Sequence, residues 1–214
     1  MDSIEKIIYI NLKDRIDRKK LLLEELSNIN NIDDKLIHFN AIKHINGSIG
    51  CTMSHIKCLE MAIQNNWKNV LILEDDAMFN DYTNGIKILD TLINKPHDVI
   101  LLGGTWCDLN VETYKLYKAQ TTTAYLTSSH YYNTLLSNFK EGLQSLEQTN
   151  ISQMYCIDVY WKKLQQKDNW YIVNPALMIQ RKGYSDISKR ETDYKNCFNI
   201  FFSLMCYNDV YKIE

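Results

Sequence analysis

The chain has 214 residues, of which 45% are hydrophobic, and this length suffices for one substantial core. A formal net charge of -2 gives no basic field, so we expect no nucleic-acid partner. The six cysteines form no CxxC pair, which argues against zinc ribbons and thioredoxin-like chemistry and predicts reduced thiols.

The first half of the sequence alternates between strand-like and helix-like patterns. Apolar runs predict strands over residues 6–12, 36–41, 70–73 and 98–102. Helical spacing predicts helices that begin near Ile16, at Gly50, and after Asn80 and Asp81, which can act as caps. The apolar faces expected for these helices comprise Ile16, Leu22, Leu23, Leu26 and Ile29, then Met53, Ile56, Leu59 and Ile63, then Tyr82, Ile86, Leu89 and Leu92. This alternation predicts an α/β fold with a mainly parallel sheet flanked by helices.

The second half is less regular. Residues 114–119 and 123–127 are predicted as short strands, for which an antiparallel pair is one option, and residues 169–173 and 177–180 as extended segments. Helices are expected over residues 131–139 and 154–164, the latter with Met154, Ile157, Trp161 and Leu164 on its apolar face. We expect one domain over residues 1–214, with a C-terminal helix at about residues 195–211 docked on it. That segment is too short for a bilayer, and with no secretory signal at the N-terminus we expect a cytoplasmic protein without a transmembrane segment.

The most informative stretch is VLILEDDAMF, in which a buried strand ends in Glu74, Asp75 and Asp76. Ligands of α/β sheets bind outside the carboxyl ends of the strands. In an extended backbone Glu74 and Asp76 point the same way and Asp75 points to the other face. Oxygen ligands suit Mn²⁺ or Mg²⁺, although such a cluster is also typical of a solvated acidic loop.

Five segments in order resemble glycosyltransferase family 25, which includes bacterial lipopolysaccharide glycosyltransferases and procollagen galactosyltransferases. These segments are IIYINLKDRIDR, IGCTMSHIKCLE, VLILEDDAMF, CIDVYW and PALMIQRKGYSDI, and they span roughly residues 7–187. The resemblance implies a GT-A type, Rossmann-like fold, a UDP-sugar donor, a divalent metal and transfer with inversion at the anomeric carbon. The acids Glu74, Asp75 and Asp76 are then the candidate metal ligands, and Glu74 and Asp75 are also candidate donor contacts. Glu74 and Asp76 are spaced as an ExD, which departs from a strict DxD.

Other candidate site residues follow from position. Asp158 is the candidate base, because its apolar neighbours would raise its pKa, and Asp186 is the second catalytic candidate. Arg15 and Arg18 lie one turn apart and suit an anionic ligand, or form an ordinary exposed helix face. Trp106 follows two glycines at a strand end, where a sugar could stack. The donor candidates are completed by Asn11, Ser54, His55 and Gln180, with Ser54 and His55 near a helix start that favours phosphate.

Several alternatives remain open at this level. His55 could contact donor or acceptor, but a structural hydrogen bond is the favoured role for a lone histidine. His130 could close a metal shell, although the family motif does not support that position. The expected acceptor is a glycan or a hydroxylysine-containing protein, and a homodimer is one option for the assembly. A noncatalytic sugar-nucleotide-binding or scaffolding domain is the main competing function. A nucleotidyltransferase or phosphohydrolase would need a glycine-rich phosphate loop or a flanked nucleophilic aspartate, and neither is evident.

Overall fold

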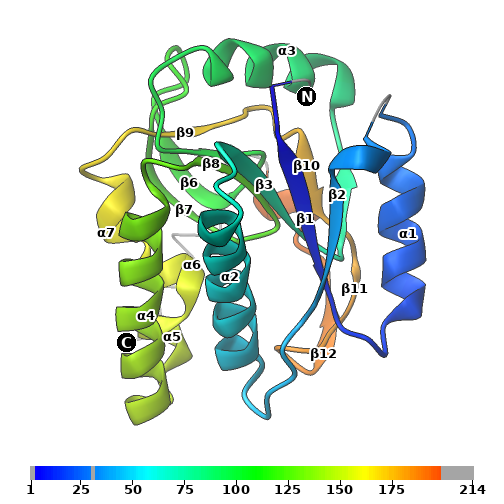
Figure 1. Ribbon diagram of the computed structural model, residues 1–214, viewed down its shortest axis with the longest axis vertical. Coiled ribbons are helices and arrows are strands. Elements are labelled where there is room, and N and C mark those ends of the chain that lie inside the picture. The colour runs from blue at the N-terminus through cyan, green and yellow to red at the C-terminus, as the bar shows by residue number, and fades with distance from the viewer. Residues whose placement is uncertain (1–2, 30–31, 199–214) are drawn as a thin grey trace.

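A computed structural model describes residues 3–29 and 32–198. Within this part of the chain the central element is a six-stranded sheet of order β2-β1-β3-β8-β5-β9 (Figure 1). Five of its strands run in one direction, and β8 alone is antiparallel to its neighbours β3 and β5. The strands are β1 (Lys6–Asn11), β2 (Leu36–Asn40), β3 (Asn69–Glu74), β5 (Val99–Leu101), β8 (Ala124–Ser128) and β9 (Trp170–Ile172).

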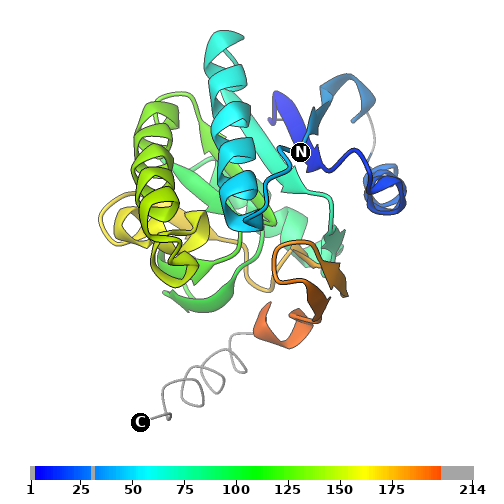
Figure 2. The same cartoon turned by 90° about the horizontal axis from the view of Figure 1, so that it is seen from below.

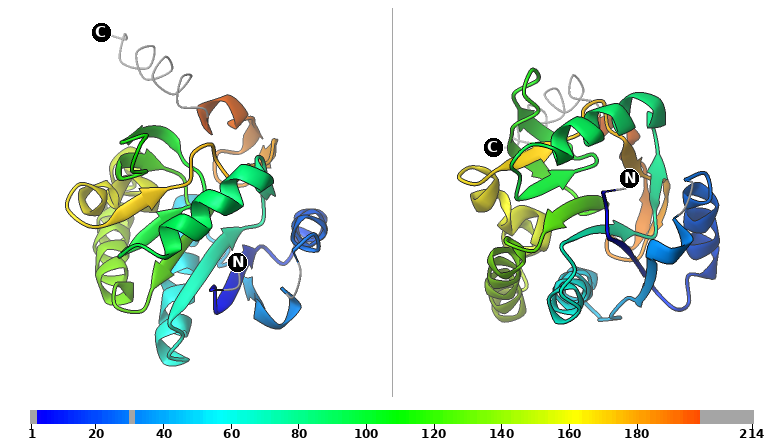
Figure 3. Two further views of the ribbon diagram at one scale, coloured as in Figure 1. Left: turned by 90° about the horizontal axis from the view of Figure 1, so that it is seen from above. Right: turned by 45° about the horizontal axis from the view of Figure 1, so that its top comes forward.

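Helices cover both faces of this sheet (Figures 1 and 3). On one face, Val70 and Ile72 of β3 pack with Leu59 of α2 and Phe139 of α4. On the other, Leu71 and Leu73 of the same strand pack with residues of α1 and α3. The long helices are α1 (Ile16–Leu26), α2 (Gly47–Gln64), α3 (Tyr82–Ile93) and α4 (Tyr132–Thr149). The α/β fold with a mainly parallel, helix-flanked sheet is therefore confirmed, and β3 reads as a continuous apolar run because both of its faces are buried.

Short elements complete the structure. Three two-stranded sheets pair β10 (Met178–Gln180) with β4 (Ala77–Phe79), β11 (Gly183–Ser185) with β12 (Arg190–Thr192), and β6 (Thr105–Leu109) with β7 (Leu116–Gln120). The remaining helical pieces are η1 (Asp33–Lys35), α5 (Ser152–Tyr155), α6 (Ile157–Tyr160), α7 (Lys162–Gln165) and η2 (Lys195–Phe198). The predicted C-terminal helix falls mostly outside the described residues.

Two expectations about pairing and helix continuity are wrong. The segments 114–119 and 123–127 do not pair with each other, because the buried β8 inserts between β3 and β5 while β7 pairs with β6. The helix expected over 154–164 is three short helices, because Cys156 adopts an extended conformation with ψ 152°. Met154 is consequently 55% exposed, whereas Ile157, Trp161 and Leu164 are buried as expected.

The expected helix starts and faces also need correction. Helix α2 begins at Gly47 rather than at Gly50, since the Asn46 side chain accepts a hydrogen bond from the Ser48 backbone N–H and caps the helix. Asp81 caps α3 as predicted, by accepting from the Asn84 N–H. Ile16, 74% exposed, and Tyr82, 40% exposed, do not face the core. A helix-terminal residue can match the apolar spacing and still project past the sheet.

Candidate functional site

Three acids meet where β3 ends. The backbone leaves the extended conformation after Glu74 and turns through Asp75 and Asp76 before β4 begins. All three carboxyl groups consequently line one cavity of about 160 Å³ at the carboxyl edge of the sheet. The expectation that Asp75 points to the opposite face is wrong, because strand alternation ends with the strand.

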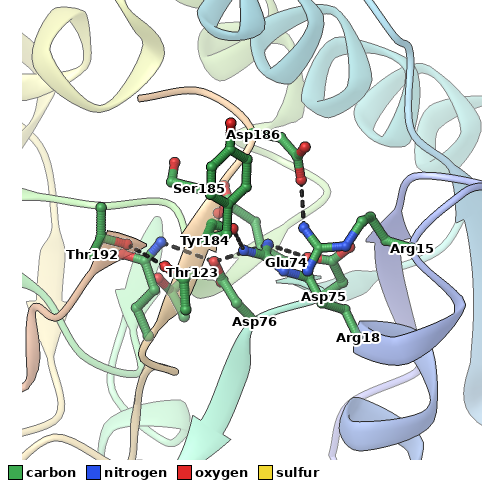
Figure 4. A network of polar contacts seen from close by, with 12 residues as sticks. Arg15, Arg18, Glu74, Asp75, Asp76, Thr123, Tyr184, Ser185, Asp186 and Thr192 are labelled. Atoms are coloured by element: carbon green, nitrogen blue, oxygen red, sulfur yellow. Dashed lines mark hydrogen bonds and ion pairs between the residues drawn. The ribbon is translucent and has the colours of Figure 1, made fainter. Parts of the chain in front are cut away.

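A single arginine holds two of these acids (Figure 4). Arg18 donates from Nη1 to Asp75 Oδ1 at 2.9 Å and to Asp76 Oδ2 at 3.3 Å. Asn11 donates from Nδ2 to Asp75 Oδ2 at 2.8 Å, and Gln180 donates from Nε2 to Asp76 Oδ2 at 2.9 Å. We call Glu74, Asp75 and Asp76 the acid turn. Three elements distant in sequence, β1, α1 and β10, therefore hold it in place.

Burial and mutual repulsion raise the pKa of both aspartates. Burial is the larger cause for Asp76, and together with the charge of Glu74 it raises the pKa of Asp76 to about 7. Burial also raises the pKa of Asp75, although the charge of Arg18 opposes this shift. Asp76 Oδ1 is buried and has no hydrogen-bond partner. The turn therefore holds more buried negative charge than Arg18 neutralises.

Glu74 is held by a different set of groups. Its Oε1 accepts hydrogen bonds from Thr122 Oγ1 at 2.5 Å and from Cys51 Sγ at 3.7 Å, and His55 Nε2 lies 3.3 Å away. Burial by itself would raise the pKa of Glu74, but the contacts of His55 and Thr122 lower it below its ordinary value. Glu74 is therefore fixed in its ionised form.

The hairpin formed by β11 and β12 (Figure 2) contributes Ser185, Asp186, Ile187 and Lys189 to the lining of the cavity. Arg15 Nη1 donates to Asp186 Oδ2 at 2.5 Å, and Arg18 Nη2 donates to the carbonyl oxygen of Tyr184 at 2.6 Å (Figure 4). The tip of the hairpin lies against the start of α2, where a Cβ on Gly47 would come within 2.9 Å of Ile187 Cα. Arg18 lines the cavity, whereas Arg15 does not line it and reaches it only through Asp186. Each arginine is already paired with carboxylates of the chain.

Two predicted donor residues make contacts within the protein. Ser54 Oγ donates to the Gly50 carbonyl oxygen at 2.7 Å and accepts from the Ile42 N–H at 2.9 Å. His55 is fully buried, with Nδ1 2.9 Å from the Tyr125 hydroxyl. Gly50 does not offer a free N–H at the helix start, because its N–H donates to the Asn46 carbonyl oxygen inside α2.

A second cavity adjoins the first and contains the candidate base. It has a volume of about 230 Å³, and Asp158 and Trp106 line it. The two cavities share Cys51, Glu74, Gln180, Ser185 and Ile187. Asp158 Oδ2 accepts from the Thr121 N–H at 3.0 Å, and its Oδ1 accepts from Cys156 Sγ at 3.1 Å. The structure thus brings Asp158 and Trp106 to the same pocket edge as the acid turn.

His130 lies elsewhere. Its Nε2 is 2.8 Å from Asp98 Oδ1, at the opposite, amino end of β5, and it lines neither cavity. Sequence reasoning missed Thr122, Cys51 and the hairpin residues Tyr184 and Ile187. Only Cys51 carried a signal, since it lies four residues before His55 and therefore shares a helix face with it.

The described residues of the site include carboxylate oxygens that suit a divalent cation. Asp76 Oδ1 is a buried carboxylate oxygen without a partner, and Glu74 lies in the same cavity. Hard cations prefer such oxygen ligands. The donor chemistry therefore fits Mn²⁺ or Mg²⁺, with Asp76 and Glu74 as the available carboxylates, because both oxygens of Asp75 are engaged by Arg18 and Asn11.

A cavity at the carboxyl edge of the strands is where α/β proteins bind their ligands. The model of glycosyltransferase family 25 (LPS biosynthesis protein) matches residues 30–157, more than half of the chain. The chain therefore belongs to glycosyltransferase family 25, and it is a glycosyltransferase.

Comparison with solved structures gives more distant likenesses. The crystal structure of A197 from STIV is 11% identical, with a TM-score of 0.46, and the match covers 88% of this chain and 93% of the other. The crystal structure of a glycosyltransferase involved in the glycosylation of the major capsid of PBCV-1 is also 11% identical, with a TM-score of 0.48 and coverage of 79% and 81%. No curated protein sequence matches the chain.

Two further properties bear on the earlier expectations. In residues 3–29 and 32–198, no helix is both long and apolar enough to span a bilayer. Within the same residues, no disulfide joins Cys51, Cys58, Cys107 or Cys156.

Proposed function

We propose that the enzyme transfers a hexose, galactose or glucose, from a UDP-sugar to a hydroxyl group of its acceptor, with inversion at the anomeric carbon. The observation that carries this proposal is the junction of two cavities at Glu74 and Gln180. Group transfer requires the donor and the acceptor to bind next to each other, and two adjoining cavities with different lining residues provide a binding site for each.

The first cavity suits the nucleotide sugar. It combines apolar residues, including Ile10 and Ile42, with Arg18 and the acid turn. Asp76 and Glu74 would hold Mn²⁺ or Mg²⁺, which would supply positive charge against the leaving diphosphate. Asp75 orients Arg18, and Asn11 and Gln180 keep the two aspartates in place.

The second cavity suits the acceptor. Trp106 offers an aromatic ring in its lining, and Asp158 and Glu74 both line the same cavity. The inverting reaction needs a carboxylate to take the proton of the attacking hydroxyl. In the proposal Asp158 takes that proton, and the Thr121 N–H holds its carboxylate in position.

The hairpin supports the donor cavity in this scheme. Asp186 acts through Arg15, and Arg18 joins the hairpin to the acid turn. Ser54 positions the segment before α2, and His55 positions Glu74. The proposed acceptor is a glycan or a hydroxylysine-containing protein. A cytoplasmic location and a homodimer are also part of the proposal.

The test is UDP release by the purified chain from a panel of UDP-sugars, with and without Mn²⁺. We expect turnover of one hexose donor that depends on the metal and is lost in Asp76→Ala and Asp158→Ala. Lys87→Ala, which changes a side chain outside both cavities, is the control. Binding of UDP without turnover of any donor would favour a noncatalytic sugar-nucleotide-binding role and would refute the proposal.

A further inference from the structure

A second set of metal-ligating atoms lies beside the acid turn. Cys51, His55 and Glu74 each present one ligand atom, and the three atoms lie within 4.8 Å of one another. The set contains one sulfur, one nitrogen and one oxygen, which is the donor chemistry of Zn²⁺-like ions rather than of Mn²⁺ or Mg²⁺. We propose that Cys51, His55 and Glu74 form a binding site for a thiophilic divalent metal, which shares only Glu74 with the acid turn.

Two of the distances between the ligand atoms are close to those of a tetrahedral centre. The His55 Nε2 to Glu74 Oε1 distance is 3.3 Å, and the Cys51 Sγ to Glu74 Oε1 distance is 3.7 Å. Bond lengths to zinc predict edges of about 3.4 Å and about 3.6 Å for these two pairs. An ion can therefore be accommodated with small side-chain movements.

The secondary structure explains why the atoms converge. Cys51 and His55 are four residues apart on α2 and so project from the same face of that helix. Glu74 reaches the same point from the end of β3. Because the helix and the strand belong to the packed core, the three ligands are held before a metal arrives.

The hydrogen-bond partner of His55 is compatible with metal binding. The Tyr125 hydroxyl lies 2.9 Å from His55 Nδ1, and both side chains are fully buried. A histidine that ligates metal through Nε2 carries its proton on Nδ1, and a hydrogen-bond acceptor at Nδ1 holds that tautomer. The Tyr125 oxygen can accept this proton, and the same hydroxyl can donate to Nδ1 when Nε2 donates to Glu74 in the metal-free site.

Access and chemistry are also satisfied. Cys51 and Glu74 line both cavities, so an ion can enter from either. Binding forms a metal–sulfur bond, and the Cys51 thiol proton passes to solvent. The site shares Glu74 with the proposed hard-cation site, but the proposal holds whether or not the transfer reaction is as described above.

The first test is Co²⁺ titration of the metal-free protein, followed by absorption spectroscopy. A thiolate ligand gives a sulfur-to-cobalt charge-transfer band. We expect this band in the wild type and in Cys58→Ser and Cys156→Ser, and its loss in Cys51→Ser. Cys58 is a control on the same helix, and Cys156 is the other thiol of the second cavity. Absence of the band from the wild type, or its persistence in Cys51→Ser, would overturn the proposal.

Two further measurements keep the test independent of one variant's folding. Zn²⁺ should slow alkylation of Cys51 in the unmodified chain, read by mass spectrometry, and should leave the rate at Cys156 unchanged. Tyr125→Phe should weaken Co²⁺ binding roughly 10- to 100-fold. Tyr132→Phe, which removes a buried hydroxyl that has no partner, should not. Equal alkylation rates with and without Zn²⁺, or unchanged affinity in Tyr125→Phe, would contradict the assignment.

Discussion

Asp76→Asn should stabilise the metal-free protein at high pH while removing its activity. The pKa of Asp76 is raised from 3.8 to about 7, chiefly by burial and by the charge of Glu74. The folded state therefore keeps a proton between about pH 4 and pH 7, where the unfolded chain has lost it. Wild-type stability consequently falls as the pH rises through this window.

The size of the effect follows from the same shift. A carboxyl group whose pKa moves from 3.8 to about 7 on folding destabilises the folded state by about 4 kcal/mol well above pH 7, and by about 2 kcal/mol at pH 5. The amide of the variant does not titrate, and its unpaired N–H₂ costs about 1–3 kcal/mol at every pH. The stability of the variant relative to the wild type should therefore increase by about 2–3 kcal/mol between pH 5 and pH 8.

The assay is urea denaturation of both proteins in chelator at pH 5 and pH 8. Asp81→Asn is the matched control. Its hydrogen bonds to Asn84 lower the pKa of Asp81 below the ordinary value, so that carboxyl group is ionised in both states across this range. The stability difference for the control should not change between the two pH values. A constant difference for Asp76→Asn as well would refute the reasoning about the buried acid turn.

Three other outcomes are expected. Mn²⁺ at about 100 times its dissociation constant should stabilise the wild type by about 2.7 kcal/mol, measured as a rise in Tm. Asp76→Asn should lose this response, and an equal rise in both proteins would exclude Asp76 as a ligand. Asp158→Asn should lower kcat about 10²- to 10⁴-fold with UDP affinity unchanged by calorimetry, and an unaltered kcat would remove Asp158 as the base. Leu71→Ala, in the fully buried centre of β3, should lower the free energy of unfolding by about 2–5 kcal/mol, and Leu21→Ala, 38% exposed, should cost much less; equal losses would contradict the described core.

Local sequence patterns determined most of the sheet and its helices. The apolar run of residues 70–73 specified β3, and the acids that follow specified the edge at which ligands are expected. Such signals are local, because burial on both faces demands apolar residues at every position of a central strand. The patterns of residues 6–12, 36–41 and 98–102 likewise became β1, β2 and β5 within one or two residues.

Tertiary structure decided which side chains meet. No spacing in the sequence indicates that Arg18 lies between Asp75 and Asp76, or that Arg15 reaches Asp186 across 171 positions. The helix break at Cys156 was likewise not indicated by the sequence. The extended conformation of Cys156 directs Asp158 to the Thr121 N–H of a distant segment.

The physical reason for this division is the range of the interactions. Periodicity and capping act within a few residues and can be read along the chain. The pairing of buried charges, the position of β8 between two other strands and the seating of Ile187 on Gly47 depend on segments that approach only after packing. The sequence by itself therefore determined the elements and the acidic edge, and only the folded chain determined which groups hold each acid.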